Sequence, residues 1–506
     1  MRNTLFSTRQ SIALAIAVGA IVGAQVIYAL GWDNYFVSDD WFFLYAVAQV
    51  NRFSELLTLV SFQTDWFVRP TQWFVTFGLY RWFGIEPRAF HVFAQLLDFS
   101  NALLVGLVLY QIFLLSKQMS RARSMVLSAL GIGLFLSSWR HHEALYWYSA
   151  SNELLTTFFK LLGLNAMLWW LGHKRQYWLV LIACVIAMAL AILSKESALL
   201  LPLETLLALF FVLLAQRDNA LPWKRGLLIV GAQFFVIGIW AFFYLQSSRL
   251  DAEGIARGGL QLLHATPVDW LLRAAQFFNA HFPGSDYVAR NAGLLGAELI
   301  LLAAITLLAI LRKQWLWLVA IIWLALSVAP YVALTADNAV RAVLARGIGG
   351  DRYVYYSAAA FSLLLIAASQ WIHHELGGRE KIASRFAGVA LLGLVVWFSA
   401  NALTIFNMER DWANAGEISK RVLNQVKAEM PAPASEDVLC FVDVPTQVNR
   451  KYVFQNGLAQ ALYLTYGRAD FQVNLWRTSR DANPDTRACA AVFTFDTRQN
   501  RLARTK

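Results

Sequence analysis

The sequence is poor in charged residues, and it contains few cysteines. Only 15% of its 506 residues are Asp, Glu, Lys or Arg, whereas soluble globular proteins carry about 25%. Its three cysteines exclude a disulfide framework and a cysteine-rich metal site. A glycine-rich phosphate loop is also missing, because neither a Walker nor a Rossmann pattern occurs in the chain. We therefore expect neither a soluble nucleotide-dependent enzyme nor a bound cofactor.

Apolar residues, in contrast, are abundant. The chain is 58% hydrophobic and 14% aromatic, and its mean hydropathy is +0.48. Such values, together with long apolar runs, are typical of a polytopic α-helical membrane protein. The net charge of +11 then reflects the excess of Lys and Arg in cytoplasmic loops, and no nucleic-acid partner is expected.

Eleven apolar runs are long enough to cross a bilayer. The first of them shows no signal-peptide cleavage pattern, so it predicts a retained first helix. A shorter run, 71–84, contains Arg81 and is expected to lie along the membrane interface. The expected spans are 11–30, 90–115, 124–139, 150–172, 177–194, 198–215, 226–246, 293–311, 315–334, 353–372 and 385–406.

The distribution of Lys and Arg between the loops orients these spans. With the N-terminus inside, each inner connection holds at least two Lys or Arg, including Arg121 and Lys224, whereas the short outer connections hold little beyond Arg140 and Lys195. The positive-inside rule therefore predicts an odd number of spans and a C-terminus outside. The outer face then collects the polar stretches 37–44, 140–143, 194–197, 247–292 and 350–353.

The composition changes after Phe406. The part before it, 1–406, is the predicted membrane module, with outer loops 31–89 and 247–292. The rest, 407–506, alternates helical and strand patterns and predicts a small extracytoplasmic α/β domain without a catalytic constellation. Cys440 and Cys489 lie in two of its predicted strands, so we expect them to form a disulfide in an oxidising compartment.

The stretch "VSDDWFFL", 37–44, places Asp39 and Asp40 next to each other at the outer face. Adjacent carboxylates repel each other, which raises the pKa of a carboxyl group toward that of a useful base. Such a pair can also cap the apolar helix that follows it. We expect at least one of Asp39 and Asp40 to be a general base. We favour Asp40, because Asp39 is better placed to cap this helix and to leave Asp40 facing a cleft.

Cations on the same face have two interpretations. Lys195, followed by Glu196, either snorkels to the interface or offers a point charge to a phosphate. Arg69 and Arg352 are either interfacial anchors or clamps on a phosphate at the membrane surface. Several cations on one face favour an anionic substrate that the membrane carries.

The stretch "RHHEALYW", 140–147, collects His142, Glu143 and aromatic residues just outside a helix. His142 and Glu143 are at most half of a metal site, because no partners with ligand spacing occur, and we predict no metal. The aromatic residues are either interface-belt residues or substrate contacts.

Six short stretches follow one another within 10–375: "SDDWFF", "VRPTQWF", "DFSNALLV", "HHEALYWYSASNELL", "LSKESALLLP" and "DRYVYYS". This ordered set resembles the GT-C class of membrane glycosyltransferases, and most of all its protein O-mannosyltransferase-related branch. The chain departs from the pattern at Asp98, where histidine is usual, and at Ser151, where arginine is frequent.

The resemblance implies an inverting transfer of a sugar from a polyprenyl-phosphate carrier to an acceptor hydroxyl of a protein, lipid or glycan. It implies a reaction at the outer face of a membrane, here expected to be a bacterial cytoplasmic membrane, with the acidic pair supplying the base. The expected partners are the lipid-linked donor, the acceptor and membrane lipids. The residues expected to bind substrate are Arg69, His142, Glu143, Trp147, Lys195, Glu196, Arg352, Tyr353 and Tyr355.

Charges inside the predicted spans bear on an alternative function. A lipid-linked sugar flippase or another transporter would need charged residues along a path through the bilayer, and few occur. Asp98 and Lys160 are two of these few. They are expected at depths of about 12 and 15 Å from the outer face, so we expect them to form an ion pair.

Overall fold

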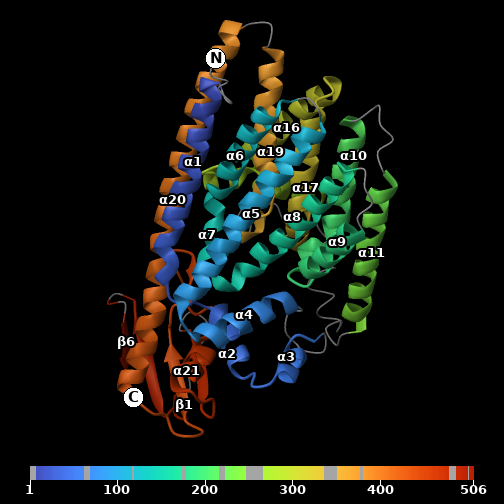
Figure 1. Ribbon diagram of the computed structural model, residues 1–506. Helices are drawn as coiled ribbons and strands as arrows, with labels where there is room; N and C mark the ends of the chain where they lie inside the picture. Colours follow the sequence, from blue (N-terminus) through green and yellow to red (C-terminus); the bar gives the residue numbers. More distant parts are fainter. Residues whose placement is uncertain are drawn as a thin grey trace.

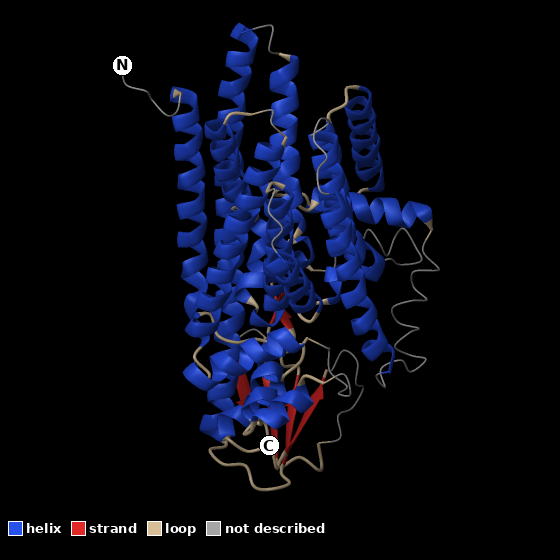
Figure 2. Ribbon diagram, turned by 45° about the vertical axis from the view of Figure 1, so that its right-hand side comes forward, coloured by secondary structure: helices blue, strands red, loops and turns tan. Residues whose placement is uncertain are grey.

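A computed structural model shows the chain as a helical bundle with a small sheet domain at one end (Figures 1 and 2). It describes residues 7–61, 69–116, 119–173, 178–215, 223–246, 266–335, 350–376, 380–477, 486–497, 499 and 501–506. Within these residues the strands belong to the C-terminal domain, and the remaining regular structure is helical.

Each of the eleven apolar runs contains a helix, because a backbone in hydrocarbon must satisfy its own hydrogen bonds. Most of these helices stand side by side in the bundle (Figure 1). They are α1 Thr8–Ala29, α5 Pro87–Leu115, α6 Arg121–Leu136, α8 Ser151–Leu171, α9 Trp178–Ile192, α10 Leu201–Ala215, α11 Trp223–Gln246, α16 Ala292–Leu311, α17 Trp315–Thr335, α19 Ser357–Glu375 and α20 Glu380–Glu429.

The length and hydropathy of these helices confirm a polytopic membrane protein. In the described part of the chain, eight helices are long and apolar enough to cross a membrane, or nine if α6 and the turns after it, bent by 50°, form one broken span. The other two expected spans do not meet this criterion. Helix α9 has 15 residues, fewer than the roughly 20 that a bilayer core requires, and α19 ends in polar residues.

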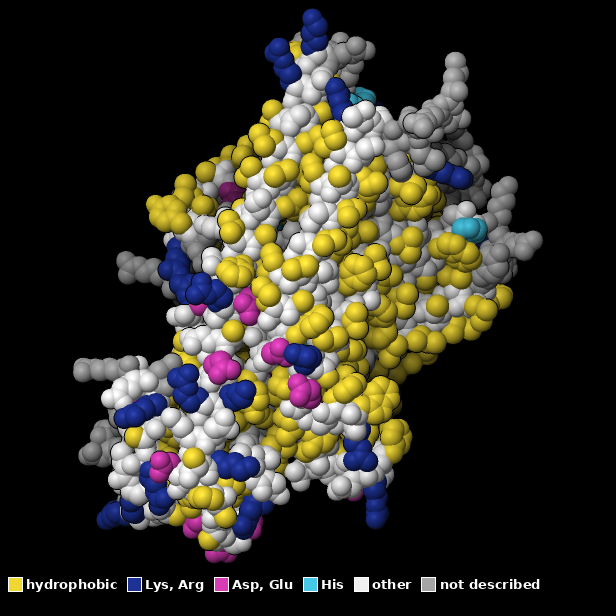
Figure 3. Space-filling model, turned by 60° about the vertical axis from the view of Figure 1, so that its left-hand side comes forward, with side chains coloured by type: hydrophobic (Ala, Val, Ile, Leu, Met, Phe, Trp, Pro, Cys, Tyr) yellow, Lys and Arg dark blue, Asp and Glu magenta, His cyan; other side chains and the backbone are white. Residues whose placement is uncertain are grey.

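The surface of the bundle has the polarity that a membrane requires. On the face shown in Figure 3, hydrophobic side chains cover the middle of the molecule, and charged side chains gather mostly toward its two ends. Exposed apolar side chains include Val22 and Val26 on α1 and Val389 and Leu392 on α20. The N-terminus and the C-terminal domain lie at opposite ends of the bundle, as an odd number of crossings requires (Figure 1).

Short helices lie at the end of the bundle nearest to the C-terminal domain. Helix α4 crosses that end at a steep angle to the long helices (Figure 1), which agrees with the interfacial position predicted for 71–84. Residues 247–265 of the predicted outer loop 247–292 lie outside the described residues. The short helices are α2 Asp39–Ala48, α3 Phe53–Leu59, α4 Pro70–Phe83, α7 His142–Tyr146, α14 Pro267–Asn279 and α15 Asp286–Ala289.

The C-terminal domain confirms the predicted α/β character. Helix α20, 50 residues long, continues unbroken past the boundary predicted at 406 and joins the bundle to the domain. The sheet has the order β4-β1-β5-β6, in which β1 is parallel to β4 and β5, and β6 is antiparallel to β5. The elements are β1 Val438–Val442, β2 Gln447–Val448, β3 Lys451–Tyr452, α21 Leu458–Tyr466, β4 Gln472–Trp476, β5 Ala491–Asp496 and β6 Arg501–Arg504.

The predicted ion pair between Asp98 and Lys160 is wrong. Lys160 Nζ lies 2.7 Å from Glu204 Oε1 on α10, and Asp98 accepts a hydrogen bond of 2.6 Å from the hydroxyl of Tyr355. Depth along a helix does not determine the direction in which a side chain points around the helix axis. Equal depth was therefore not sufficient to pair these two residues.

The disulfide between Cys440 and Cys489 is confirmed, with their Cα atoms 5.9 Å apart. Cys440 lies in β1, and Cys489 lies just before the neighbouring parallel strand β5, so the sheet itself brings the two thiols together.

Replacing both bonded cysteines by serine is expected to lower the free energy of unfolding of the domain. The bond joins residues 49 positions apart, and releasing a loop of this length costs about 4 kcal/mol. Thermal melting of the purified chain, with and without reductant, measures this loss. Cys184→Ser is the control, because Cys184 is a free cysteine. A non-reducing peptide map without a Cys440–Cys489 cross-link would contradict the assignment.

Candidate active site

The segment between α6 and α8 is the centre of the candidate site. It forms three short helical turns, Trp139–His141, α7 and Tyr148–Ala150, and every residue from 139 to 157 is buried. Polar side chains that are buried in this way require partners. Several of them find partners in distant parts of the chain: in 194–196, in 350–353, in α2 and in the C-terminal domain.

Two ion pairs hold the 350–353 turn against this segment. Arg352 pairs with Glu143, and Arg140 pairs with Asp351. Glu143 also accepts a hydrogen bond of 3.2 Å from the backbone N–H of Arg352. Because a buried charge without its partner costs several kcal/mol, these contacts fix the position of both chain segments.

Three cations act on one another in this region: Arg69, Lys195 and Arg352. Lys195 pairs with Glu153, whose other carboxylate oxygen accepts a hydrogen bond of 2.7 Å from Tyr331. Burial is the main cause that lowers the pKa of Lys195 to about 8, and the positive charges of Arg69 and Arg352 lower it as well. Like charges held this close favour a bound anion, which would relieve their repulsion.

Aromatic rings surround these cations. Lys195 Nζ lies 5.0 Å from the ring centroids of both Tyr331 and Tyr353. The guanidinium of Arg352 lies 4.8 Å from the ring of Trp147 and 4.5 Å from that of Tyr353. The predicted site residues that meet in this group are Arg69, Glu143, Trp147, Lys195, Glu196, Arg352 and Tyr353, with Glu196 Oε2 located 3.9 Å from Arg69 Nη2.

Helix α20 and the C-terminal domain reach the site through His142, although no functional constellation was expected in this domain. Trp412 donates a hydrogen bond of 2.9 Å to His142 Nδ1, so the proton of a neutral ring lies on Nε2, which is 2.8 Å from Asp351 Oδ2. Lys451 Nζ lies 3.5 Å from the same Nε2. His142 therefore joins the bundle to the domain. Among the described residues, no group of three His, Cys, Asp or Glu could hold a metal ion.

The acidic pair occupies two different environments, and the predicted division of roles between capping and cleft is wrong. Asp40 is fully buried: Oδ1 accepts hydrogen bonds from the N–H and hydroxyl of Ser149 at 2.7 and 2.6 Å, and Oδ2 accepts one from Val37 N–H at 3.1 Å. Asp40 thus closes the first turn of α2. Asp39 is half-buried and accepts a hydrogen bond of 2.7 Å from Asn456.

The environment of Asp40 gives it the proton affinity of a base that works near neutral pH. Burial raises the pKa of Asp40 to about 7, against the three hydrogen bonds that favour its charged form, and the charge of Asp39 adds to the rise. A carboxylate has about four acceptor positions. The hydrogen bonds from Ser149 and Val37 occupy three of them, two on Oδ1 and one on Oδ2, so an acceptor position remains on Oδ2.

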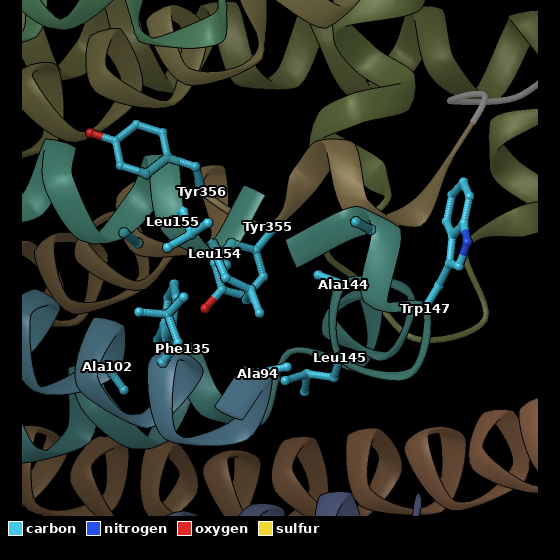
Figure 4. Close-up of a cluster of buried hydrophobic side chains, with 14 of the residues drawn as sticks. Ala94, Ala102, Phe135, Ala144, Leu145, Trp147, Leu154, Leu155, Tyr355 and Tyr356 are labelled. Carbon is cyan, nitrogen blue, oxygen red and sulfur yellow. The ribbon is translucent and has the colours of Figure 1, made fainter. Parts of the chain in front are cut away.

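Tyr355 is the predicted substrate residue that the structure places elsewhere. Its ring centroid lies 4.3 Å from that of His141 and 5.4 Å from that of Phe135, and its hydroxyl bonds Asp98. Figure 4 shows Tyr355 inside the hydrophobic cluster, with Trp147 well apart from it. Residues two positions apart in a helical turn point in different directions, so Tyr353 reaches the cations and Tyr355 is a core residue.

Several residues of the site were missed by the sequence analysis. Asp351 precedes Arg352 directly in the "GDRY" stretch, and Glu153 is an acid within a predicted span. Asp351 adjoins a residue that was already a candidate, and a charge in an apolar run, such as Glu153, is itself a sign of function, so both could have been found. Tyr331 lies inside an apolar run, and Lys451 lies in a separate domain. No pattern in the sequence connects these two residues with the site.

Comparisons with known proteins found structural neighbours. No family model and no curated protein matches the sequence. The chain is similar to ArnT from Cupriavidus metallidurans bound to undecaprenyl phosphate, with 12% identity and a TM-score of 0.42 over 94% of this chain and 92% of that one. It is also similar to the archaeal oligosaccharyltransferase AglB from Archaeoglobus fulgidus in complex with an inhibitory peptide and a dolichol-phosphate. That match has 9% identity and a TM-score of 0.41 over 90% of this chain and 64% of that one.

The overlap is loose in both cases, so we base the functional proposal on the side chains of the site.

Asp40 is expected to make the folded protein less stable as the pH rises. Its pKa of about 7 lies above the ordinary value of 3.8, so between these values the folded chain holds a proton that the unfolded chain has released. The free energy of unfolding therefore falls from about pH 4 to about pH 7 and then levels off. The expected total change is about 4 kcal/mol.

Melting temperatures of the wild type and of Asp40→Asn, measured from about pH 5 to about pH 8, test this expectation. The wild type should lose stability relative to the variant over this range, because the variant has no carboxyl group to ionise. Asp33→Asn is the matched control, since Asp33 is an exposed carboxylate near the same end. Parallel curves for the wild type and Asp40→Asn would show that Asp40 does not titrate in this range.

Proposed function

We propose that the protein is an inverting glycosyltransferase that moves a sugar from a polyprenyl-phosphate carrier to an acceptor hydroxyl. The acceptor oxygen attacks C1 of the sugar, and the bond between C1 and the phosphate oxygen breaks. The acceptor proton passes to a carboxylate, and polyprenyl phosphate leaves with the bonding electron pair. Such a reaction needs a base, a group that stabilises the leaving phosphate, and access to the membrane.

The convergence of Arg69, Lys195 and Arg352 carries this proposal. The leaving phosphate gains negative charge in the transition state, and cations that are already in place stabilise it at little reorganisation cost. Glu153 and Glu143 hold Lys195 and Arg352 in position through ion pairs. Arginine offers a phosphate two parallel N–H donors, and lysine adds a compact charge.

Asp40 is the proposed general base. Its pKa of about 7 suits proton transfer at neutral pH. Ser149 binds Asp40, and Trp147, two residues earlier, contacts Arg352. The chain from Trp147 to Ser149 spans no more than about 7 Å. The proposed base and a phosphate-binding cation therefore contact the same short stretch of chain.

We place the reaction at the outer face of the membrane. In a bacterium, this is the face of the cytoplasmic membrane that points away from the cytoplasm. The distribution of Lys and Arg in the loops supports this face. The disulfide at the same end of the molecule supports it too, because disulfides persist in oxidising compartments. In this proposal the membrane module 1–406 binds the lipid-linked donor, and the domain 407–506 completes the site.

Sugar transfer by the purified chain in detergent, without ATP or an ion gradient, tests the proposal against a lipid-linked sugar flippase. The acceptor is a protein, a lipid or a glycan. Mass spectrometry of the lipids and glycans that accumulate in a strain lacking the chain identifies the donor and the acceptor to use. A purified chain that binds the donor but transfers no sugar to any accumulated acceptor would contradict the proposal.

Asp40→Asn is expected to lower the rate of sugar transfer by about 10²–10⁴-fold, the usual cost of losing a general base. The rate of the wild type should rise with pH through about 7, where Asp40 loses its proton. Asp33→Asn, which removes an exposed carboxylate, is the control. Asp39→Asn should cause a smaller loss, because Asp39 contacts Asn456. Transfer by a folded Asp40→Asn variant at the wild-type rate would overturn this assignment.

Arg69→Gln is expected to raise the KM for the lipid-linked donor by about 10- to 100-fold, because one charge-assisted hydrogen bond to the phosphate is lost. Arg69 is suited to this test, since its ion pair with Glu196 is long, at 3.9 Å, and its removal leaves a partly exposed acid. Arg88→Gln is the control, because Arg88 is an exposed arginine at the same end. Equal KM values for the two variants would show that Arg69 does not bind the donor.

A further inference from the structure

A polar cavity lies at the opposite end of the molecule from the candidate active site. It has a volume of about 850 Å³ and is formed by the start of α6, the ends of α10 and α19, and the turn between α16 and α17. Helix α19 begins beside the ion-paired 350–353 turn, and its residues from Ala367 to His374 line this cavity. At 1.5 Å per residue, these lining residues lie about 15 to 25 Å along the helix from its start.

The lining of this cavity is cationic. Arg123, Arg312, Lys313, His373 and His374 belong to it, and none of its described lining residues is Asp or Glu. Arg123 is half-buried and donates a hydrogen bond to Gln370, which also lines the cavity. Glu375 lies beside the rim, where it pairs with Arg312 at 3.3 Å. Arg123 and Lys313, the other two cations of the lining, border a hollow large enough for a ligand.

Apolar and aromatic side chains form the rest of the wall. Trp315, Trp317 and Trp371 line it, together with Phe211 and Leu214 at the end of α10. Tryptophan is enriched where a membrane meets water, because its ring is apolar and its N–H is polar. A cavity whose wall combines cations with apolar rings matches an amphiphile that carries a phosphate group.

We propose that this cavity binds the phosphate headgroup of an anionic membrane lipid. Arg123 and Lys313 contact the phosphate, and the tryptophan rings pack against the first part of the acyl chains. A lipid headgroup and a free phosphate ion both offer a phosphate group to these cations. The apolar wall assigns the site to the lipid. This site is separate from the proposed transfer reaction and does not depend on it.

Native mass spectrometry of the detergent-solubilised full chain tests the proposal. Phosphatidylglycerol is titrated against phosphatidylcholine with the same acyl chains and against inorganic phosphate. We expect one tight site for phosphatidylglycerol, and weaker binding in the double variant Arg123→Gln, Lys313→Gln. Each Lys or Arg near an anionic lipid contributes about fivefold in affinity, so the expected loss is about 25-fold.

The matched control is the double variant Arg121→Gln, Arg385→Gln. Both residues are exposed near the same end of the bundle but do not line the cavity, so this variant should keep the wild-type affinity. Equal losses in both double variants would reduce the effect to general attraction by a basic surface and overturn the proposal. Equal affinity for the two lipids, or displacement of phosphatidylglycerol by inorganic phosphate at millimolar concentration, would overturn it as well. Unchanged melting temperatures show that the variants are folded.

Discussion

A charge that is buried away from water must be paired, and the end of the molecule that carries the C-terminal domain is organised by this requirement. The pairs Arg352–Glu143 and Lys195–Glu153 join chain segments that are far apart in the sequence. Removing one member of such a pair leaves the other charge buried and unpaired. The segments therefore hold one another in a single arrangement, although hydrophobic packing alone would allow them to shift.

The same pairing prepares the site for chemistry. The acids keep Lys195 and Arg352 charged and in place, and Arg69 adds a third cation to the group. In the proposed function, a phosphate that binds here relieves the repulsion among these cations, so part of its binding energy is present before it arrives. Burial lowers the pKa of Lys195, whereas it raises the pKa of Asp40 toward neutrality and makes Asp40 a stronger base.

The C-terminal domain is part of this arrangement, because α20 runs without a break from the membrane bundle into the domain. Trp412 on α20 and Lys451 in the domain both contact His142, and Asn456 contacts Asp39. The domain therefore touches both the acidic pair and the segment that holds the cations. Because the connection is a continuous helix, it fixes the position of the domain, and so of these contacts, relative to the bundle.

Hydropathy and charge distribution by themselves determined the helical runs, the placement of the termini at opposite ends and the collection of polar stretches at one end, because burial in lipid constrains every residue of a span. The paired strands and the disulfide also followed from local patterns. Only the tertiary structure decided that Asp40 and not Asp39 is buried, that Lys160 meets Glu204, and that Tyr355 belongs to the core. These outcomes depend on the rotation of each helix about its axis and on contacts between distant segments. A step of one residue turns a side chain by about 100°, and no local pattern records which neighbour it then meets.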